Sequence, residues 1–137
     1  QDKMYHAEKG KGCFLVQNGM ELPLHIRPLV TDGILNIVGS RSHQTPELLA
    51  YVEQQKQKFS RVEFVPAGSS LKFCLISEGK ADVYPRLGPT MEWDTAAGQL
   101  IATEAGAQVV VWETGMPLSY NRENLLNPNF IVKHPAL

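Results

Sequence analysis

The sequence predicts an α/β protein in which a layered α/β/α domain with a mostly parallel five-stranded sheet follows a short antiparallel β-meander. Two observations carry this prediction. From Gly33 onward, short apolar runs of the buried-strand type alternate with helical patterns, as in sheets joined by helical crossovers. Before that point, a Lys-Gly-Lys-Gly turn and an Asn-Gly turn separate short apolar runs, which is typical of hairpins. We therefore assign residues 1–30 to the meander and residues 31–137 to the α/β domain.

The meander is expected to contain strands at residues 4–8, 13–16 and 21–27. These segments have too few apolar residues for a core of their own, and two or three strands without a covering layer are marginally stable in water.

In the α/β domain, capping and apolar patterns indicate both kinds of element. Thr45 and Pro46 open a first helix as N-cap and first helical residue, and Ser69 or Ser70 is expected to cap a second. A third helix is expected from Asp94 to residue 105, closed by Gly106. The expected strands are residues 34–38, 61–65, 82–84, 108–112 and 130–133.

Composition excludes several classes of partner. The chain has 13 Lys and Arg against 14 Asp and Glu, a net charge of −1, so no global field favours nucleic acid or an anionic membrane. No apolar run approaches the roughly 20 residues of a spanning helix. We expect a cytoplasmic protein and keep open a peripheral position at the inner membrane face. Cys13 and Cys74 lie in apolar strings and are expected to be reduced core residues.

Polar residues gather where the expected strands end. In an open α/β sheet the loops that follow parallel strands emerge at one edge, where ligands bind. The loops of this chain bring basic, hydroxyl and acidic side chains to that edge. The residues that carry these side chains are Ser40, Arg41, Ser42, His43, Ser69, Ser70, Lys72, Tyr84, Arg86, Glu92 and Asp94.

The string Gly-Ser-Ser-Leu-Lys at residues 68–72 has two interpretations. A serine after a glycine turn is an ordinary helix N-cap. Lys72, however, occupies the first turn, where the helix dipole disfavours a cation by roughly 0.3–1 kcal/mol. A bound phosphate would turn this penalty into attraction.

Asp94 also has two interpretations. An acid at the start of a helix is a favourable cap, but a cap alone does not explain why Ala96, Ala97 and Gly98 follow it. Three small residues let another helix, or a metal and phosphate site, approach the backbone closely. We expect Glu92 to be a solvated side chain.

Three strings together resemble a known family. Trp-Asp-Thr-Ala-Ala-Gly at residues 93–98 resembles the C-terminal metal-ligand motif of the inositol monophosphatase superfamily. Residues 68–72 and Ala-Asp-Val-Tyr-Pro-Arg at residues 81–86 are similar to the 3'(2'),5'-bisphosphate nucleotidases of the CysQ type within it. The Ser-Arg-Ser-His string at residues 40–43 and the tail at residues 120–128 extend the resemblance.

The resemblance implies roles for individual residues. Asp94 would be a ligand of Mg²⁺, and Ser69, Lys72 and Arg86 would hold phosphate. His43 would lie beside the bound nucleotide. No catalytic residue is assigned within the chain.

The resemblance also implies an activity and a missing part. Enzymes of this family remove the 3'-phosphate of 3'-phosphoadenosine 5'-phosphate to give AMP, with Mg²⁺ polarising the ester and activating water. Their other metal motif, an Asp-Pro-Leu/Ile-Asp-Gly-Thr run, belongs to an N-terminal half that should precede Gln1. We therefore expect a C-terminal half that is inactive alone. Two alternatives stay open: an inositol monophosphatase-like phosphatase, and a non-catalytic phosphate-binding module.

In this interpretation the meander is what remains of the N-terminal α+β domain. Its outer strand should lack a neighbour, and an unpaired edge either pairs with a second copy or frays. A homodimer through residues 4–27 is thus one expected outcome, and a disordered segment is the other.

Overall fold

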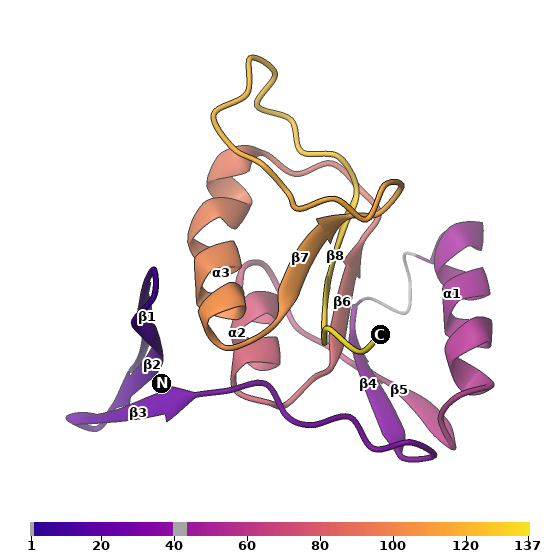
Figure 1. Ribbon diagram of the computed structural model, residues 1–137, viewed down its shortest axis with the longest axis horizontal. Coiled ribbons are helices and arrows are strands. Elements are labelled where there is room, and N and C mark those ends of the chain that lie inside the picture. The colour runs from indigo at the N-terminus through magenta and orange to yellow at the C-terminus, as the bar shows by residue number, and fades with distance from the viewer. Residues whose placement is uncertain (1, 40–43) are drawn as a thin grey trace.

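The computed structural model describes residues 2–39 and 44–137 and shows two sheets and three helices in this part of the chain (Figure 1). A three-stranded antiparallel sheet comes first, with β1 paired to β2 and β2 to β3. A five-stranded sheet follows in the order β5-β4-β6-β8-β7. The elements are β1 (Lys3–Glu8), β2 (Gly12–Gln17), β3 (Met20–Leu24), β4 (Ile34–Val38), α1 (Pro46–Lys56), β5 (Arg61–Val65), α2 (Leu71–Ser77), β6 (Val83–Arg86), α3 (Glu92–Glu104), β7 (Gln108–Val111) and β8 (Phe130–Lys133).

The larger sheet is mostly parallel, as the sequence predicts. Strands β4, β5 and β6 run in the same direction. Strand β8 is antiparallel to both β6 and β7, so β7 shares the direction of β6 and only β8 is reversed. The β8 strand can run backward because a long loop, residues 112–129, separates it from β7 instead of a helical crossover.

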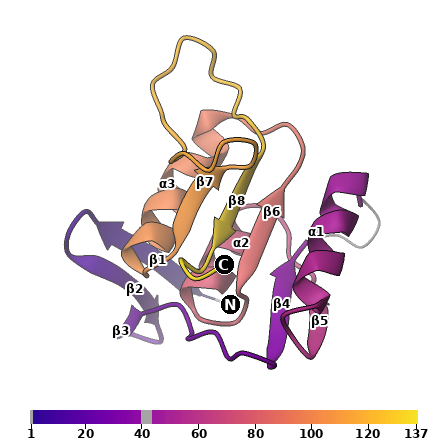
Figure 2. The same cartoon turned by 45° about the vertical axis from the view of Figure 1, so that its right-hand side comes forward.

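Each face of the larger sheet has its own core (Figure 2). On one face, Leu48 and Val52 of α1 pack with Leu35 and Ile37 of β4. The other face is covered by α2 and α3, and their core includes Phe73, Ile76, Tyr84, Ala102, Phe130 and Val132. Neighbouring residues of β4, β6 and β8 alternate between the two cores, as the two-residue period of a strand requires.

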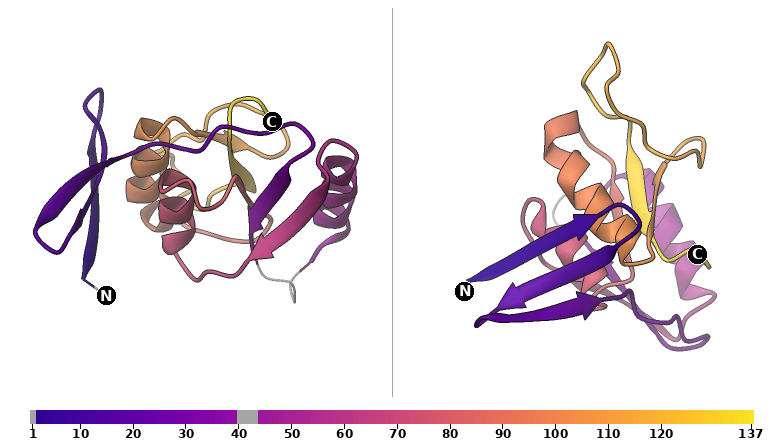
Figure 3. Two further views of the ribbon diagram at one scale, coloured as in Figure 1. Left: turned by 90° about the horizontal axis from the view of Figure 1, so that it is seen from below. Right: turned by 60° about the vertical axis from the view of Figure 1, so that its left-hand side comes forward.

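The meander forms a fourth layer on the outer side of α2 and α3 (Figure 3). Cys13 and Leu15 of β2 are buried there, and the backbone N–H of Ile26 donates to the carbonyl of Ala105 over 2.9 Å. The meander thus packs against the helices, which supply the covering layer that it lacks alone. Whether its strand edges pair with a second copy stays a prediction.

Two carboxylates fasten the meander to the helices. Glu104, the last residue of α3, accepts the backbone N–H groups of Gly10 and Gly12 over 2.9 and 3.0 Å. Glu78, just after α2, is buried and accepts the hydroxyl of Tyr5. The ammonium groups of Lys3 and Lys80 lie 3.4 and 2.6 Å from the Glu78 carboxylate.

Helices α2 and α3 meet at Gly98. A Cβ atom added at this residue would lie 2.5 Å from Cδ2 and 2.7 Å from Cγ of Phe73, both shorter than real contacts. The small residues after Asp94 therefore serve, at Gly98, the close approach of a second helix, which is one of the two interpretations that the sequence allows.

Most elements lie within two residues of their expected positions, with informative exceptions at helix starts. Thr45 caps α1 as predicted, accepting the N–H of Leu48 over 3.2 Å. Ser70 is the N-cap residue of α2, as predicted, but its side chain makes no capping hydrogen bond. Helix α3 begins at Glu92, two residues before the predicted start, because the Asp94 carboxylate bonds back to the N–H of Met91 from the third helical position.

We predict that Gly98→Ala lowers the free energy of unfolding by about 1–3 kcal/mol, because overpacking forces Phe73 or a helix to move. Urea denaturation measures the change. Gly88→Ala is the control, since a Cβ atom there meets its nearest neighbour, Nε of Arg86, at an ordinary 3.9 Å. Equal stability of the two variants would contradict the close contact.

Glu78 should make the attachment of the meander sensitive to acid. Burial alone would raise the pKa of Glu78, but bonds from Lys80 and Tyr5 and the charges of Lys80 and Lys3 outweigh it and hold the pKa below its ordinary 4.5. The stabilisation is therefore complete at neutral pH and is lost as the pH falls below about 4.5 through the folded-state pKa.

Urea denaturation at pH 7 and near pH 4 tests this prediction. Glu78→Gln should lose stability at pH 7 and depend less on pH than the unmodified chain. Glu53→Gln, at an exposed carboxylate paired with Lys56, is the control. If Glu78→Gln kept the full pH dependence, the carboxylate would not be its source.

Candidate functional site

A cavity of about 490 Å³ opens where α2, β6 and α3 meet. The starts of both helices and the end of β6 contribute side chains, as expected for the carboxyl edge of an α/β sheet. Its lining combines hydroxyl, basic, acidic and aromatic groups: Ser69, Ser70, Lys72, Phe73, Tyr84, Arg86, Pro89, Thr90, Trp93, Asp94, Thr95, Ala97 and Gly98. Four residues that the sequence assigns to the site, Ser69, Lys72, Arg86 and Asp94, thus come together.

Lys72 lies in the first turn of α2, above a buried aromatic ring. Its Nζ is 5.1 Å from the ring centre of Tyr84, a cation–π distance. Burial, followed by the nearby positive charge of Arg86, lowers the pKa of Lys72. A bound anion would relieve the repulsion between these two cations.

Arg86 ends β6, which carries it to the edge of the sheet. One Nη atom donates to the carbonyl of Pro89 over 3.3 Å. Its Nε is buried and has no acceptor among residues 2–39 and 44–137. A guanidinium with donors to spare suits the oxygens of a phosphate, which it can bind in a fork.

Asp94 is the acid of the cavity. Its Oδ2 accepts the N–H of Met91 over 2.8 Å, and the side chain is exposed. Within the described ranges, no group of three or more His, Cys, Asp or Glu side chains is arranged to hold a metal ion. Mg²⁺ takes about six oxygen ligands in octahedral geometry. Asp94 can therefore supply one of these ligands, and the others must come from elsewhere.

Ser69 and Ser70 line the cavity, and Ser70 is the N-cap residue of α2 without a side-chain capping bond. Ser69 has a positive φ of 50°, a left-handed conformation that turns the chain sharply before α2. Both serines line the cavity together with Lys72. His43, together with Ser40, Arg41 and Ser42, lies outside the described residues, so its placement beside the nucleotide stays a prediction.

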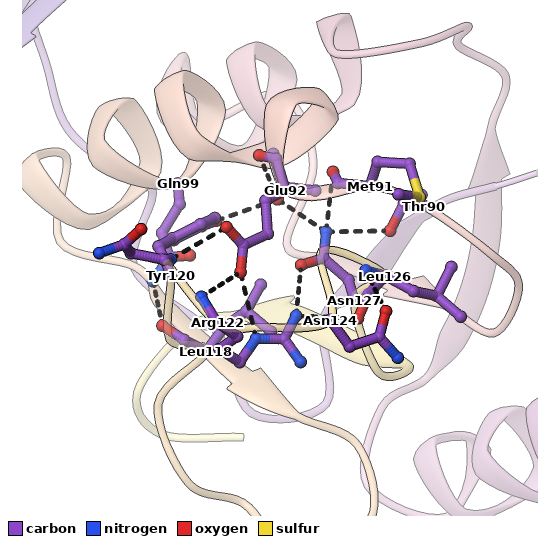
Figure 4. Close-up of polar contacts among 12 residues, drawn as sticks. Thr90, Met91, Glu92, Gln99, Leu118, Tyr120, Arg122, Asn124, Leu126 and Asn127 are labelled. Carbon is purple, nitrogen blue, oxygen red and sulfur yellow. Dashed lines mark hydrogen bonds and ion pairs between the residues drawn. The ribbon is translucent and has the colours of Figure 1, made fainter.

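The expectation for Glu92 is wrong. Glu92 is only 9% exposed. Its two carboxylate oxygens accept the backbone N–H groups of Asn121 and Arg122 over 2.9 and 3.1 Å (Figure 4). The sequence does not reveal this burial because the partners lie about 30 positions further along the chain.

Other cavity residues received no role from the sequence. Thr90 and Trp93 both line the cavity, and Trp93 is exposed. The sequence could have placed Trp93 at the cavity, because it directly precedes Asp94 within the motif at residues 93–98. No sequence feature could have placed Thr90 there, because nothing in its local sequence distinguishes it from an ordinary turn residue.

Comparison with known proteins places the chain in a family. Residues 1–136 match the sequence model of the inositol monophosphatase family. The chain belongs to this family. Its members are metal-dependent phosphatases, which agrees with the acid and the cations found around the cavity.

Relatives of known name sharpen the comparison. The chain is 44% identical over 134 residues to the 3'(2'),5'-bisphosphate nucleotidase CysQ of Escherichia coli K12, covering 94% of this chain and 49% of that protein. It is 54% identical over 70 residues to an uncharacterised protein of Rhizobium leguminosarum bv. phaseoli, covering 47% of this chain and 73% of that protein. The chain spans about half the length of the CysQ relative.

Solved structures share the fold. The crystal structure of CysQ from Bacteroides thetaiotaomicron superposes with a TM-score of 0.79 at 41% identity, covering 96% of this chain and 54% of that one. The 2'AMP-bound SaIMPase-II shares the fold with a TM-score of 0.75 at 22% identity, covering 99% of this chain and 49% of that one.

No helix in the described part of the chain is long and apolar enough to cross a membrane. The cellular location that the sequence favours stays a prediction.

We predict that Lys72→Met weakens binding of inorganic phosphate about tenfold, because a charge-assisted hydrogen bond contributes about 1.5–3 kcal/mol. Isothermal titration calorimetry with phosphate, without added metal, measures the change. Lys58→Met removes the same charge from an exposed position outside the cavity. Equal weakening in both variants would mean a general charge effect and would remove Lys72 from the site.

Proposed function

We propose that this chain is the phosphate-binding half of a Mg²⁺-dependent 3'(2'),5'-bisphosphate nucleotidase. The reaction is removal of the 3'-phosphate of 3'-phosphoadenosine 5'-phosphate to give AMP and phosphate. The observation that carries the proposal is that Lys72, Arg86 and Asp94, from three separate elements, line one cavity. The name of the CysQ relatives supports the choice of a nucleotide bisphosphate.

The basic residues would bind the charged substrate. Arg86 lines the cavity with a planar guanidinium, whose fork of N–H donors matches the geometry of a phosphate group. Lys72 adds a positive charge that burial has already partly desolvated, so its attraction to a phosphate is weakly screened. Together they would orient the ester with one phosphate directed toward Asp94.

Asp94 would hold a metal ion. When bound, Mg²⁺ polarises the phosphate ester and lowers the pKa of a bound water. The side-chain bond to Met91 fixes the Asp94 carboxylate through Oδ2, which leaves Oδ1 as the oxygen for the ion. Further ligands would be water, substrate oxygens and carboxylates of the half that the longer relatives possess.

The proposal predicts that the 137-residue chain releases no phosphate from 3'-phosphoadenosine 5'-phosphate, because one carboxylate cannot retain Mg²⁺ at millimolar concentration. Fusion to the N-terminal half of Escherichia coli CysQ should restore Mg²⁺-dependent release. Asp94→Asn in the fusion should abolish it. A phosphate-release assay with purified proteins measures all three.

The outcomes separate the proposal from its alternatives. Faster release from inositol monophosphate would favour an inositol monophosphatase-like enzyme. Phosphate binding without turnover in the fusion would favour a non-catalytic binding module. Turnover by the unfused chain that disappears in Asp94→Asn would reveal a complete site within these residues and would sink the proposal of a half-enzyme.

A further inference from the structure

The first turn of α3 is held by a buried polar network that the proposed reaction does not use directly. At its centre, Glu92 accepts the backbone N–H groups of Asn121 and Arg122, and Nε of Arg122 lies 3.3 Å from its Oε1 (Figure 4). The partners belong to residues 118–127, which we call the clasp loop. A buried carboxylate is retained only where it is well bonded, and here its bonds connect α3 to this loop.

A second set of bonds reinforces the connection. Asn127, only 5% exposed, donates through Nδ2 to the carbonyl of Met91 over 3.0 Å and to the hydroxyl of Thr95 over 2.9 Å. Tyr120 donates its hydroxyl to the same Thr95 oxygen over 3.0 Å. The clasp loop therefore holds residues 91–95 from one side.

The backbone takes part as well. The N–H of Glu92 donates to the carbonyl of Leu125 over 2.9 Å, and the N–H of Asn127 donates to the carbonyl of Thr90 over 2.8 Å. These two bonds flank a bridge between Met91 and Leu126. The start of α3 is thus fixed on the clasp loop by main-chain and side-chain bonds together.

Helix geometry connects this network to the cavity. Residues two apart in an α-helix are about 200° apart around its axis, whereas residues three apart share a face. Glu92 and Thr95 therefore face the clasp loop, where both are buried. Asp94 faces the other way and lines the cavity.

We propose that Glu92 is a positioning residue for Asp94: by binding the clasp loop it fixes the first turn of α3 and hence the place of the metal-ligating carboxylate. This inference rests on the proposed function, because it takes Asp94 as a metal ligand. Glu92 touches neither substrate nor metal and acts through the helix.

The other end of α3 offers a matched control. Glu104 also accepts two backbone N–H groups, those of Gly10 and Gly12, and also joins α3 to another segment. It lies at the opposite end of the helix from Asp94. Glu92→Ala and Glu104→Ala therefore remove the same kind of anchor, and only the first should disturb Asp94.

The experiment uses Mn²⁺ alone as a paramagnetic probe of the 137-residue chain, because broadening of NMR signals detects even weak occupancy. The readout is the Mn²⁺ concentration that half-broadens the backbone amide of Asp94. Glu92→Ala should raise it about tenfold, the effect of losing a group that orients a metal ligand. Glu104→Ala should leave it unchanged, although both variants lower stability.

If Glu92→Ala does not fold, Glu92→Gln takes its place in the experiment, because glutamine has nearly the same shape as glutamate. Its NH₂ group must face a donor of the clasp loop, so it should weaken Mn²⁺ binding in the same direction. Unchanged Mn²⁺ binding in the folded Glu92 variant, or equal weakening in Glu104→Ala, would overturn the positioning role while leaving Asp94 as a ligand. If the unfused chain shows no broadening, the same titration is made on the fusion with the N-terminal half of Escherichia coli CysQ, and absence of broadening at Asp94 there would overturn the metal assignment in the proposed function and this inference with it.

Discussion

The contact between Gly98 and Phe73 is the constraint on which the candidate site depends. Helices α2 and α3 approach so closely that a single Cβ atom at Gly98 would overlap the Phe73 ring. Lys72 precedes Phe73 in α2, and Asp94 lies one helical turn before Gly98 in α3. The close packing of the two helices therefore brings the cation and the acid to one cavity, and interiors are too densely packed to absorb a change there without movement.

The chemistry of the cavity follows from burial and from the sign of its charges. Burial, followed by the positive charge of Arg86, lowers the pKa of Lys72. Two cations held together in a partly buried place are stabilised by an anion. A lone carboxylate at the same cavity cannot satisfy Mg²⁺ by itself. Oxygens of a substrate phosphate and of further ligands would have to complete the coordination of the ion.

Helix α3 is anchored at both ends by carboxylates that accept backbone N–H groups. Glu104 joins it to the meander, and Glu92 joins it to the clasp loop. Helix α3 thus lies between the meander on one side and the larger sheet on the other (Figure 3). Asp94 projects from the first turn of the helix into the cavity, so its position depends on the anchor at Glu92, whereas Glu104 lies at the opposite end of the helix.

The sequence by itself determined the order of elements, the layered sheet and the four residues that meet in the cavity, because strand and helix periods, glycine turns and motif spacing are local signals. Thr45 as a cap was predictable for the same reason. The tertiary structure alone decided the reversed direction of β8, the burial of Glu92 and the packing of the meander on α3. In each case the deciding bonds join segments far apart in the chain, such as Glu92 with Arg122 or Gly10 with Glu104. Local periodicity carries no information about such partners, since their contact exists only after the chain has folded.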